Sequence, residues 1–198
     1  MNSYSELFQI EGEEISALGQ SIAPDEITHL VTILKKNTHN VFLTGCGTSA
    51  MAARKITHTL NVVGLAAFYL NPSDAVHGGL GQVKQNDVVI FISKGGSTKE
   101  LTSFVANIEF KKAKIITITE NLDSVLAQKA DLAVQIKVKR ELDKFNLLAT
   151  TSTLAVISLF DVIAALLMQE QHFSKNDFLL NHPAGKVGKQ LAKEVKND

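Results

Sequence analysis

Residues 88–100 read VVIFISKGGSTKE, and this stretch decides the fold. Five apolar and mostly β-branched residues stand together at 88–92, which is typical of a strand buried on both faces of a parallel sheet. Two glycines and three hydroxyl residues follow, and a helical pattern begins at about Ser97. A strand, a small-residue loop and a helix start together predict a phosphate site, because unpaired N–H groups and the helix dipole favour an anion. The alternative is a tight turn in which Ser97 or Thr98 only caps the helix.

Apolar runs and helical patterns alternate on either side of this stretch. Further strands are predicted at residues 41–43, 64–70, 114–119 and 132–138, the last at a sheet edge because apolar and polar residues alternate in it. The sequence therefore predicts an α/β fold, a three-layer αβα sandwich around a five-stranded parallel sheet. Residues 1–38 are expected to form N-terminal helices that pack on the domain or on a partner subunit, and residues 39–198 to form the domain itself.

The composition excludes several classes of protein. Twenty basic and twenty acidic residues cancel, so neither a nucleic-acid groove nor an anionic membrane surface is indicated. A single cysteine, Cys46, and a start without signal-peptide character favour a cytoplasmic location. A helix at about residues 150–171 is apolar on nearly all sides and is expected inside the fold or between subunits. Its apolar stretch is interrupted by Ser158 and Asp161 and is expected to be too short to span a bilayer.

A second glycine-rich turn, GCGTSA at residues 45–50, follows the first predicted strand. It matches the dinucleotide pattern G-x-G-x-x-A, which also requires an acidic residue at the end of the second strand. The sequence there is Tyr69-Leu70-Asn71. Two Ser/Thr-rich turns at the carboxyl ends of parallel strands therefore favour one phosphate monoester, held from several sides, over a nucleotide.

These motifs resemble those of the sugar isomerase (SIS) domain. GCGTS at residues 45–49 is similar to the family's first glycine turn, and SKGGSTKE at 93–100 to its S-x-S-G-x-[ST]-x-E phosphosugar loop. ATTST at 149–153 and HPAGKVG at 182–188 resemble the KpsF/GutQ branch, the D-arabinose 5-phosphate isomerases. Many members of that branch carry a pair of CBS domains after the SIS domain, and none is expected within residues 1–198.

The resemblance implies aldose–ketose isomerisation of a sugar phosphate, without a required cofactor, in a homotetramer with active sites at subunit interfaces. The phosphate-binding residues that it implies are Gly47, Thr48, Ser49, Ser93, Gly96, Ser97 and Thr98, and the catalytic residues are Glu141, His182 and His77. A carboxylate suits removal of a carbon-bound proton, and a histidine suits ring opening or transfer of the hydroxyl proton. No metal site is predicted, because no cluster of Cys, His and Asp has ligand spacing.

Three positions depart from the pattern of the branch. Thr48 stands where Lys is usual, Gly95 where Ser is usual and Ser97 where Glu is usual. Lys94, next to these positions in the chain, either restores a charge or is simply solvated. The retained Glu141 and His182 favour an enzyme, whereas the lost Lys and Glu favour a non-catalytic sugar-phosphate sensor that uses the same pocket.

Overall fold

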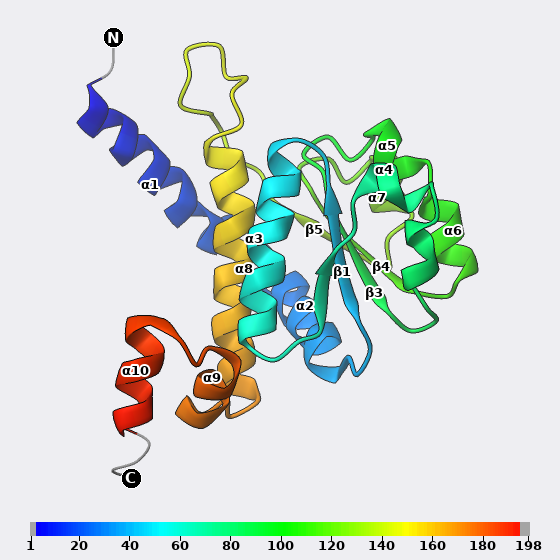
Figure 1. The fold of residues 1–198 in the computed structure, drawn as a ribbon. Coiled ribbons are helices and arrows are strands. Elements are labelled where there is room, and N and C mark those ends of the chain that lie inside the picture. Colours follow the sequence, from blue (N-terminus) through cyan, green and yellow to red (C-terminus); the bar gives the residue numbers. More distant parts are fainter. Residues whose placement is uncertain (1–2, 195–198) are drawn as a thin grey trace.

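The computed structural model describes residues 3–194 and has one parallel sheet with helices on both faces (Figure 1). Its strands lie in the order β2-β1-β3-β4-β5. They are β1 (Val41–Gly45), β2 (Ala67–Tyr69), β3 (Val88–Ile92), β4 (Lys114–Thr119) and β5 (Leu132–Gln135). The predicted fold class is confirmed, and β5 lies at an edge, as its alternating pattern predicts.

The quoted strand β3 is the middle of the sheet. All five of its residues are buried, and Ile90 pairs with Leu43 of β1 on one side and with Ile116 of β4 on the other. The chain passes from β1 outward to β2 and then returns to place β3 on the other side of β1. In parallel α/β sheets, ligands bind at the carboxyl ends of the strands where the order reverses in this way. The two glycine turns follow β1 and β3, so both lie at this place.

The helices form two unequal layers around the sheet (Figure 1). The long helices that cover one face are α2 (Pro24–Lys36), α3 (Thr48–Val62) and α8 (Thr151–Glu170), with α1 (Tyr4–Ser21) against α8. The short helices of the other face are α4 (Pro72–Ala75), α5 (Lys99–Thr102), α6 (Val105–Phe110) and α7 (Val125–Gln128). A 3₁₀ turn, η1 (Gly79–Gln82), follows α4, and α9 (Lys175–Asn181) and α10 (Gly185–Glu194) follow α8. Each face has its own hydrophobic core.

The helix expected after the central loop differs from the prediction in one respect. It begins at Lys99 and is divided into α5 and α6 at Phe104, whose φ of −121° and ψ of 6° are not helical. The Phe104 ring is fully buried and lies 5.5 Å from the Phe91 ring, centroid to centroid. The helical spacing of the apolar residues does not indicate this break, because apolar residues face the core both before and after Phe104.

Helix α8 lies within the predicted range of residues 150–171, but the expectation that its apolar stretch is too short to span a bilayer is wrong by length and composition. It runs for 20 residues and reaches a mean hydropathy of 2.0, so by length and composition alone it could cross a membrane. Here α8 packs against α1, α2 and α3, and seven of its residues are buried. Leu154 and Val162 remain 38% and 54% exposed. The single chain therefore covers only part of a helix that is apolar on nearly all sides.

Candidate functional site

A pocket of about 80 Å³ opens at the carboxyl ends of β3 and β4, on the face covered by α3 and α8. Apolar side chains from the strands and from α8 form part of its wall, among them Ile92, Ile118 and Val156. Its polar lining includes Thr48, Ser49, Lys94, Glu120, Ser152 and Thr153. The pocket is therefore an apolar cleft with hydroxyls and two opposite charges around it, as expected for binding a small polar ligand.

The first glycine turn places the start of α3 beside this pocket. Gly47 is the N-cap of α3, with φ 57° and ψ −128°, a backbone conformation that residues other than glycine rarely adopt. Because glycine has no side chain, it makes no side-chain hydrogen bond to the start of the helix. The first hydrogen bond of the helix runs from Ala50 N to Gly47 O. Within residues 3–194, the backbone N–H groups of Thr48 and Ser49 have no acceptor. The helix N-terminus at the pocket is therefore open to an anion.

The second glycine turn is held together by its own side chains. Ser93 Oγ accepts a hydrogen bond from Gly96 N at 3.1 Å and lies 3.1 Å from Thr98 Oγ1. Gly96 has φ +66°, and a Cβ there would stand 2.0 Å from Ser124 Oγ, so no other residue fits. Ser93 is buried, and Ser97 is exposed. Of the seven predicted phosphate-binding residues, Thr48 and Ser49 line the pocket, while the residues of the second turn shape the adjacent loop.

The predicted base Glu141 is buried at the start of α8. Its Oε2 accepts hydrogen bonds from Thr150 N at 3.0 Å, Ser152 N at 3.1 Å and Thr150 Oγ1 at 3.2 Å. Its Oε1 accepts one from Lys94 Nζ at 2.7 Å, and the Glu141 side chain is 1% exposed. Burial alone would raise the pKa of Glu141, but the hydrogen bonds from Lys94, Ser152 and Thr150 outweigh it and lower the pKa to about 2. Glu141 thus joins the β3 loop to the first turn of α8.

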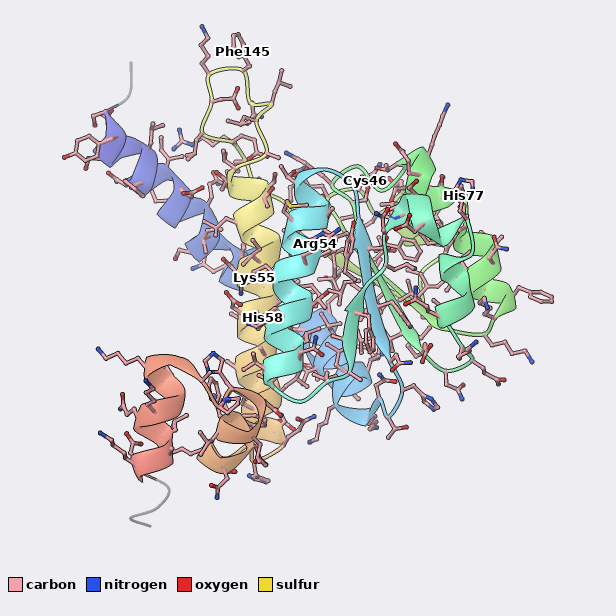
Figure 2. The ribbon with its side chains drawn as sticks, in the orientation of Figure 1. Cys46, Arg54, Lys55, His58, His77 and Phe145 are labelled. Atoms are coloured by element: carbon pink, nitrogen blue, oxygen red, sulfur yellow. The ribbon has the colours of Figure 1, made fainter. Side chains whose placement is uncertain are left out.

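The two predicted catalytic histidines lie away from the pocket of their own chain. His77 follows α4, is exposed, and stands on the α4 side of the sheet (Figure 2). His182 ends α9, which contacts the far end of α3, where Asn181 Nδ2 donates a hydrogen bond to Val62 O at 3.1 Å. The 1.5 Å rise per residue puts about 20 Å between Val62 and Thr48 at the pocket. His182 Nδ1 is buried without a hydrogen-bond partner in the described part of the chain.

The first turn favours neither a dinucleotide site nor a nucleophilic thiol at Cys46. At the end of β2, where a dinucleotide site needs an acid, Tyr69 donates a hydrogen bond to Gly45 O at 3.3 Å, and Arg54 Cζ lies 4.0 Å from its ring centroid. Burial, and then the Glu100 charge, raise the pKa of the Cys46 thiol, which disfavours the nucleophilic thiolate. Figure 2 shows Cys46 at the top of β1 and Arg54 on α3.

The pocket contains one charged residue to which the sequence pattern assigned no role, Glu120, and one that was left open between restoring a charge and being solvated, Lys94. Glu120 follows β4 directly and Lys94 lies two residues after the end of β3, and their backbones are joined because Glu120 N donates a hydrogen bond to Lys94 O at 2.9 Å. The signal that could have found them is position alone, because residues just after parallel strands share the edge where ligands bind. No group of three or more His, Cys, Asp or Glu side chains among residues 3–194 could hold a metal ion.

Comparisons with known proteins agree with this fold. Residues 33–166 match the SIS domain family. An uncharacterized protein of Helicobacter pylori (strain ATCC 700392 / 26695) is 36% identical over 196 residues, covering 96% of this chain and 60% of that protein. The arabinose 5-phosphate isomerase KdsD of Francisella tularensis is 33% identical over 199 residues, covering 100% of this chain and 61% of that enzyme.

Two solved structures are similar over most of the chain. A Listeria monocytogenes protein, described as a proposed sugar-phosphate isomerase, is 39% identical with a TM-score of 0.89, covering 91% of this chain and 94% of that one. A protein of Escherichia coli CFT073 in complex with arabinose 5-phosphate is 30% identical with a TM-score of 0.85, covering 92% of this chain and 100% of that one.

This chain therefore belongs to the SIS domain family, within which its relatives include phosphosugar isomerases. More narrowly, it is similar to the arabinose 5-phosphate isomerases KdsD, GutQ and KpsF at 31–33% identity. It spans about 60% of the length of the curated relatives it matches.

Proposed function

We propose that this chain is a sugar-phosphate aldose–ketose isomerase, with arabinose 5-phosphate as the first candidate substrate. The observation that carries the proposal is the pocket beside the open N-terminus of α3, where the N–H groups of Thr48 and Ser49 have no acceptor within residues 3–194. The 30% identical Escherichia coli structure contains arabinose 5-phosphate, which supports the same class of ligand here. A phosphate on these N–H groups would anchor the sugar away from the atoms that react, and so orient them.

The chemistry needs a carboxylate to move a proton between two neighbouring carbons through an enediol. Two glutamates meet that requirement at this edge of the sheet: Glu141 behind Lys94, and Glu120 in the pocket lining. The ammonium group of Lys94 bonds Glu141, and Lys94 lines the pocket together with Glu120, so its positive charge would favour the anionic enediol.

In this proposal a second copy of the chain completes the site. His182 follows Asn181, which bonds Val62 at about 20 Å along α3 from Thr48 at the pocket, so in this proposal His182 acts in the pocket of another copy. The loop at residues 139–150 also projects beyond α8, with Phe145 near its tip (Figure 2). Its side chains Phe145, Leu147 and Leu148 are 67%, 81% and 61% exposed. Exposed apolar groups of this size favour contact between copies, consistent with the expected homotetramer.

A non-catalytic sugar-phosphate sensor is the second candidate, and one observation favours it. The carboxylate predicted as the base, Glu141, already accepts four hydrogen bonds, and its pKa of about 2 makes it a weak proton acceptor. Thr48 and Ser97 also leave the two turns without the usual Lys and Glu. The same pocket would then bind a sugar phosphate without turning it over.

Proton exchange in D₂O separates the two candidates. The pure protein would be incubated with a panel of pentose and hexose phosphates, including arabinose 5-phosphate, and followed by NMR. Ketose formation with deuterium at C1 or C2 is expected, and a His29→Ala variant should match the wild type because His29 lies outside the site. A sugar that raises the melting temperature without exchange would establish the sensor instead. An inactive His182→Ala variant, purified identically, would exclude a contaminating isomerase.

A further inference from the structure

Glu141 is poorly placed to take a proton from carbon. Removing its negative charge would weaken the hydrogen bonds from Thr150 N and Ser152 N that start α8, and the bond from Lys94. Its carboxylate is not among the groups that line the pocket. Its low pKa also leaves little driving force for protonation near neutral pH. These contacts make Glu141 an anchor for α8 rather than a base.

Glu120 has the opposite surroundings. It follows β4 directly, and its backbone is fixed on both sides: its N–H donates to Lys94 O at 2.9 Å, and its carbonyl accepts from Gln135 Nε2 at 2.9 Å. Its partly buried side chain lines the pocket. Across residues 3–194, its carboxylate has no hydrogen-bond or ion-pair partner. A rigid backbone with an uncommitted carboxylate in a pocket is what a proton-transfer group requires.

Lys94 supplies a positive charge to the same pocket. Its carbonyl accepts hydrogen bonds from Thr119 Oγ1 and Glu120 N, both at 2.9 Å, so the two residues stand on adjoining strand ends. The Nζ of Lys94 donates to Glu141 Oε1 at 2.7 Å, and its side chain is 45% exposed. An ammonium group has three N–H bonds, and within the described chain only one of these meets an acceptor. The others remain available to a ligand in the pocket.

The geometry points to Glu120 as the catalytic residue that carries the proton between C1 and C2 of the sugar phosphate, with Glu141 as the anchor of α8. This inference rests on the proposed isomerase function. In this assignment, Glu120 at the end of β4 and Lys94 after β3 supply the pocket with a carboxylate and a cation. Thr48 and Ser97, which stand where the branch usually has Lys and Glu, carry no charge.

The step balances without a co-reactant. The Glu120 carboxylate removes the proton from C2 of the open-chain aldose, the C2–H electron pair becomes the C1=C2 bond, and O1 takes the negative charge beside Lys94. The hydroxyl proton on O2 passes to O1. The protonated Glu120 then returns its proton to C1, and the C2–O2 bond becomes the carbonyl of the ketose.

Replacing Glu120 by Gln tests the assignment, because the amide keeps the size of the side chain and cannot accept the proton. We expect kcat to fall by about 10²–10⁴-fold, with the melting temperature unchanged because the carboxylate has no partner to lose. Inorganic phosphate should raise the melting temperature of this variant as much as that of the wild type. Glu109→Gln, on α6 of the opposite face, is the matched control and should retain full activity. Glu120→Asp, which keeps the charge, should recover part of kcat.

The outcomes separate this inference from the function it rests on. If the wild type turns over a sugar phosphate and Glu120→Gln retains its kcat, the role of Glu120 is wrong and the isomerase stands. If Glu141→Gln is well folded and alone loses turnover, the proton belongs to Glu141. If no sugar phosphate exchanges deuterium with the wild type, both the isomerase and this role fall together.

Discussion

Replacing Glu141 by Gln should destabilise the protein in a pH-dependent way. The Glu141 carboxyl has a pKa of about 2 in the folded chain against its ordinary 4.5, because hydrogen bonds from Lys94, Ser152 and Thr150 outweigh the effect of burial. That difference corresponds to about 3 kcal/mol of folding free energy at neutral pH. Because the folded pKa is the lower one, this stabilisation is complete above about pH 4.5 and is lost as the pH falls towards 2.

Urea unfolding followed by circular dichroism measures this contribution directly. The free energy of unfolding of Glu141→Gln should lie about 3 kcal/mol below that of the wild type at pH 7, and the gap should narrow steadily below pH 4.5, where the wild-type carboxyl begins to lose its advantage. Glu109→Gln removes only an exposed pair with Lys129 and should differ from the wild type by less than about 1 kcal/mol. A gap of equal size at pH 7 and pH 3, or no gap at pH 7, would show that Glu141 does not anchor α8.

Three further changes test other parts of the structure. Gly96→Ala should lower the free energy of unfolding by about 2 kcal/mol or more, because its Cβ would stand 2.0 Å from Ser124 Oγ; Gly95→Ala, with nothing within 4 Å of its Cβ, should be nearly neutral in the same urea titration. Mixing inactive His182→Ala and Glu120→Gln chains after joint refolding should restore about a quarter of the active sites if each site combines two copies, and turnover that stays at the level of the separate variants would contradict a shared site. Val162→Asp, in the apolar groove of about 550 Å³ between α1, α2 and α8, should shift the protein to smaller species in sedimentation velocity, and an unchanged sedimentation coefficient would place the contact elsewhere.

The sheet could be predicted from the sequence because each strand has its own local signal. Strand β3 is buried on both faces, and its residues form an unbroken apolar run. Strand β5 is buried on one face, and its apolar and polar residues alternate. The pattern of apolar residues therefore indicates both strands. The break at Phe104 could not be predicted, because it depends on how the ring fits against Phe91 across the core.

The candidate site was only partly accessible from the sequence. The first turn could be placed at the pocket because glycine and hydroxyl residues follow a strand there. Glu141 lies in a run of charged residues typical of a solvated surface, and only the folded chain brings its carboxylate under the start of α8. No motif assigns a role to Glu120, and its place in the pocket follows from the pairing of β3 with β4.

The projecting loop at residues 139–150 is closed at its base, and its tip is joined to that base because Glu141 N donates a hydrogen bond to Asn146 Oδ1 at 2.5 Å. Leu142 N donates to Thr150 Oγ1, while Asp143 accepts backbone hydrogen bonds from Phe145, Leu147 and Leu148. The hydrogen bonds that Glu141 accepts from Thr150 N and Ser152 N lie at the base of the loop, and Asn146 connects the tip to the same residue. The number of residues at the tip can change at a small cost, because the entropic cost of closing a loop grows only slowly with its length. The outer loop is thus a place where related chains can gain or lose residues, and change the partner they contact, as long as the contact between Asn146 and Glu141 is kept.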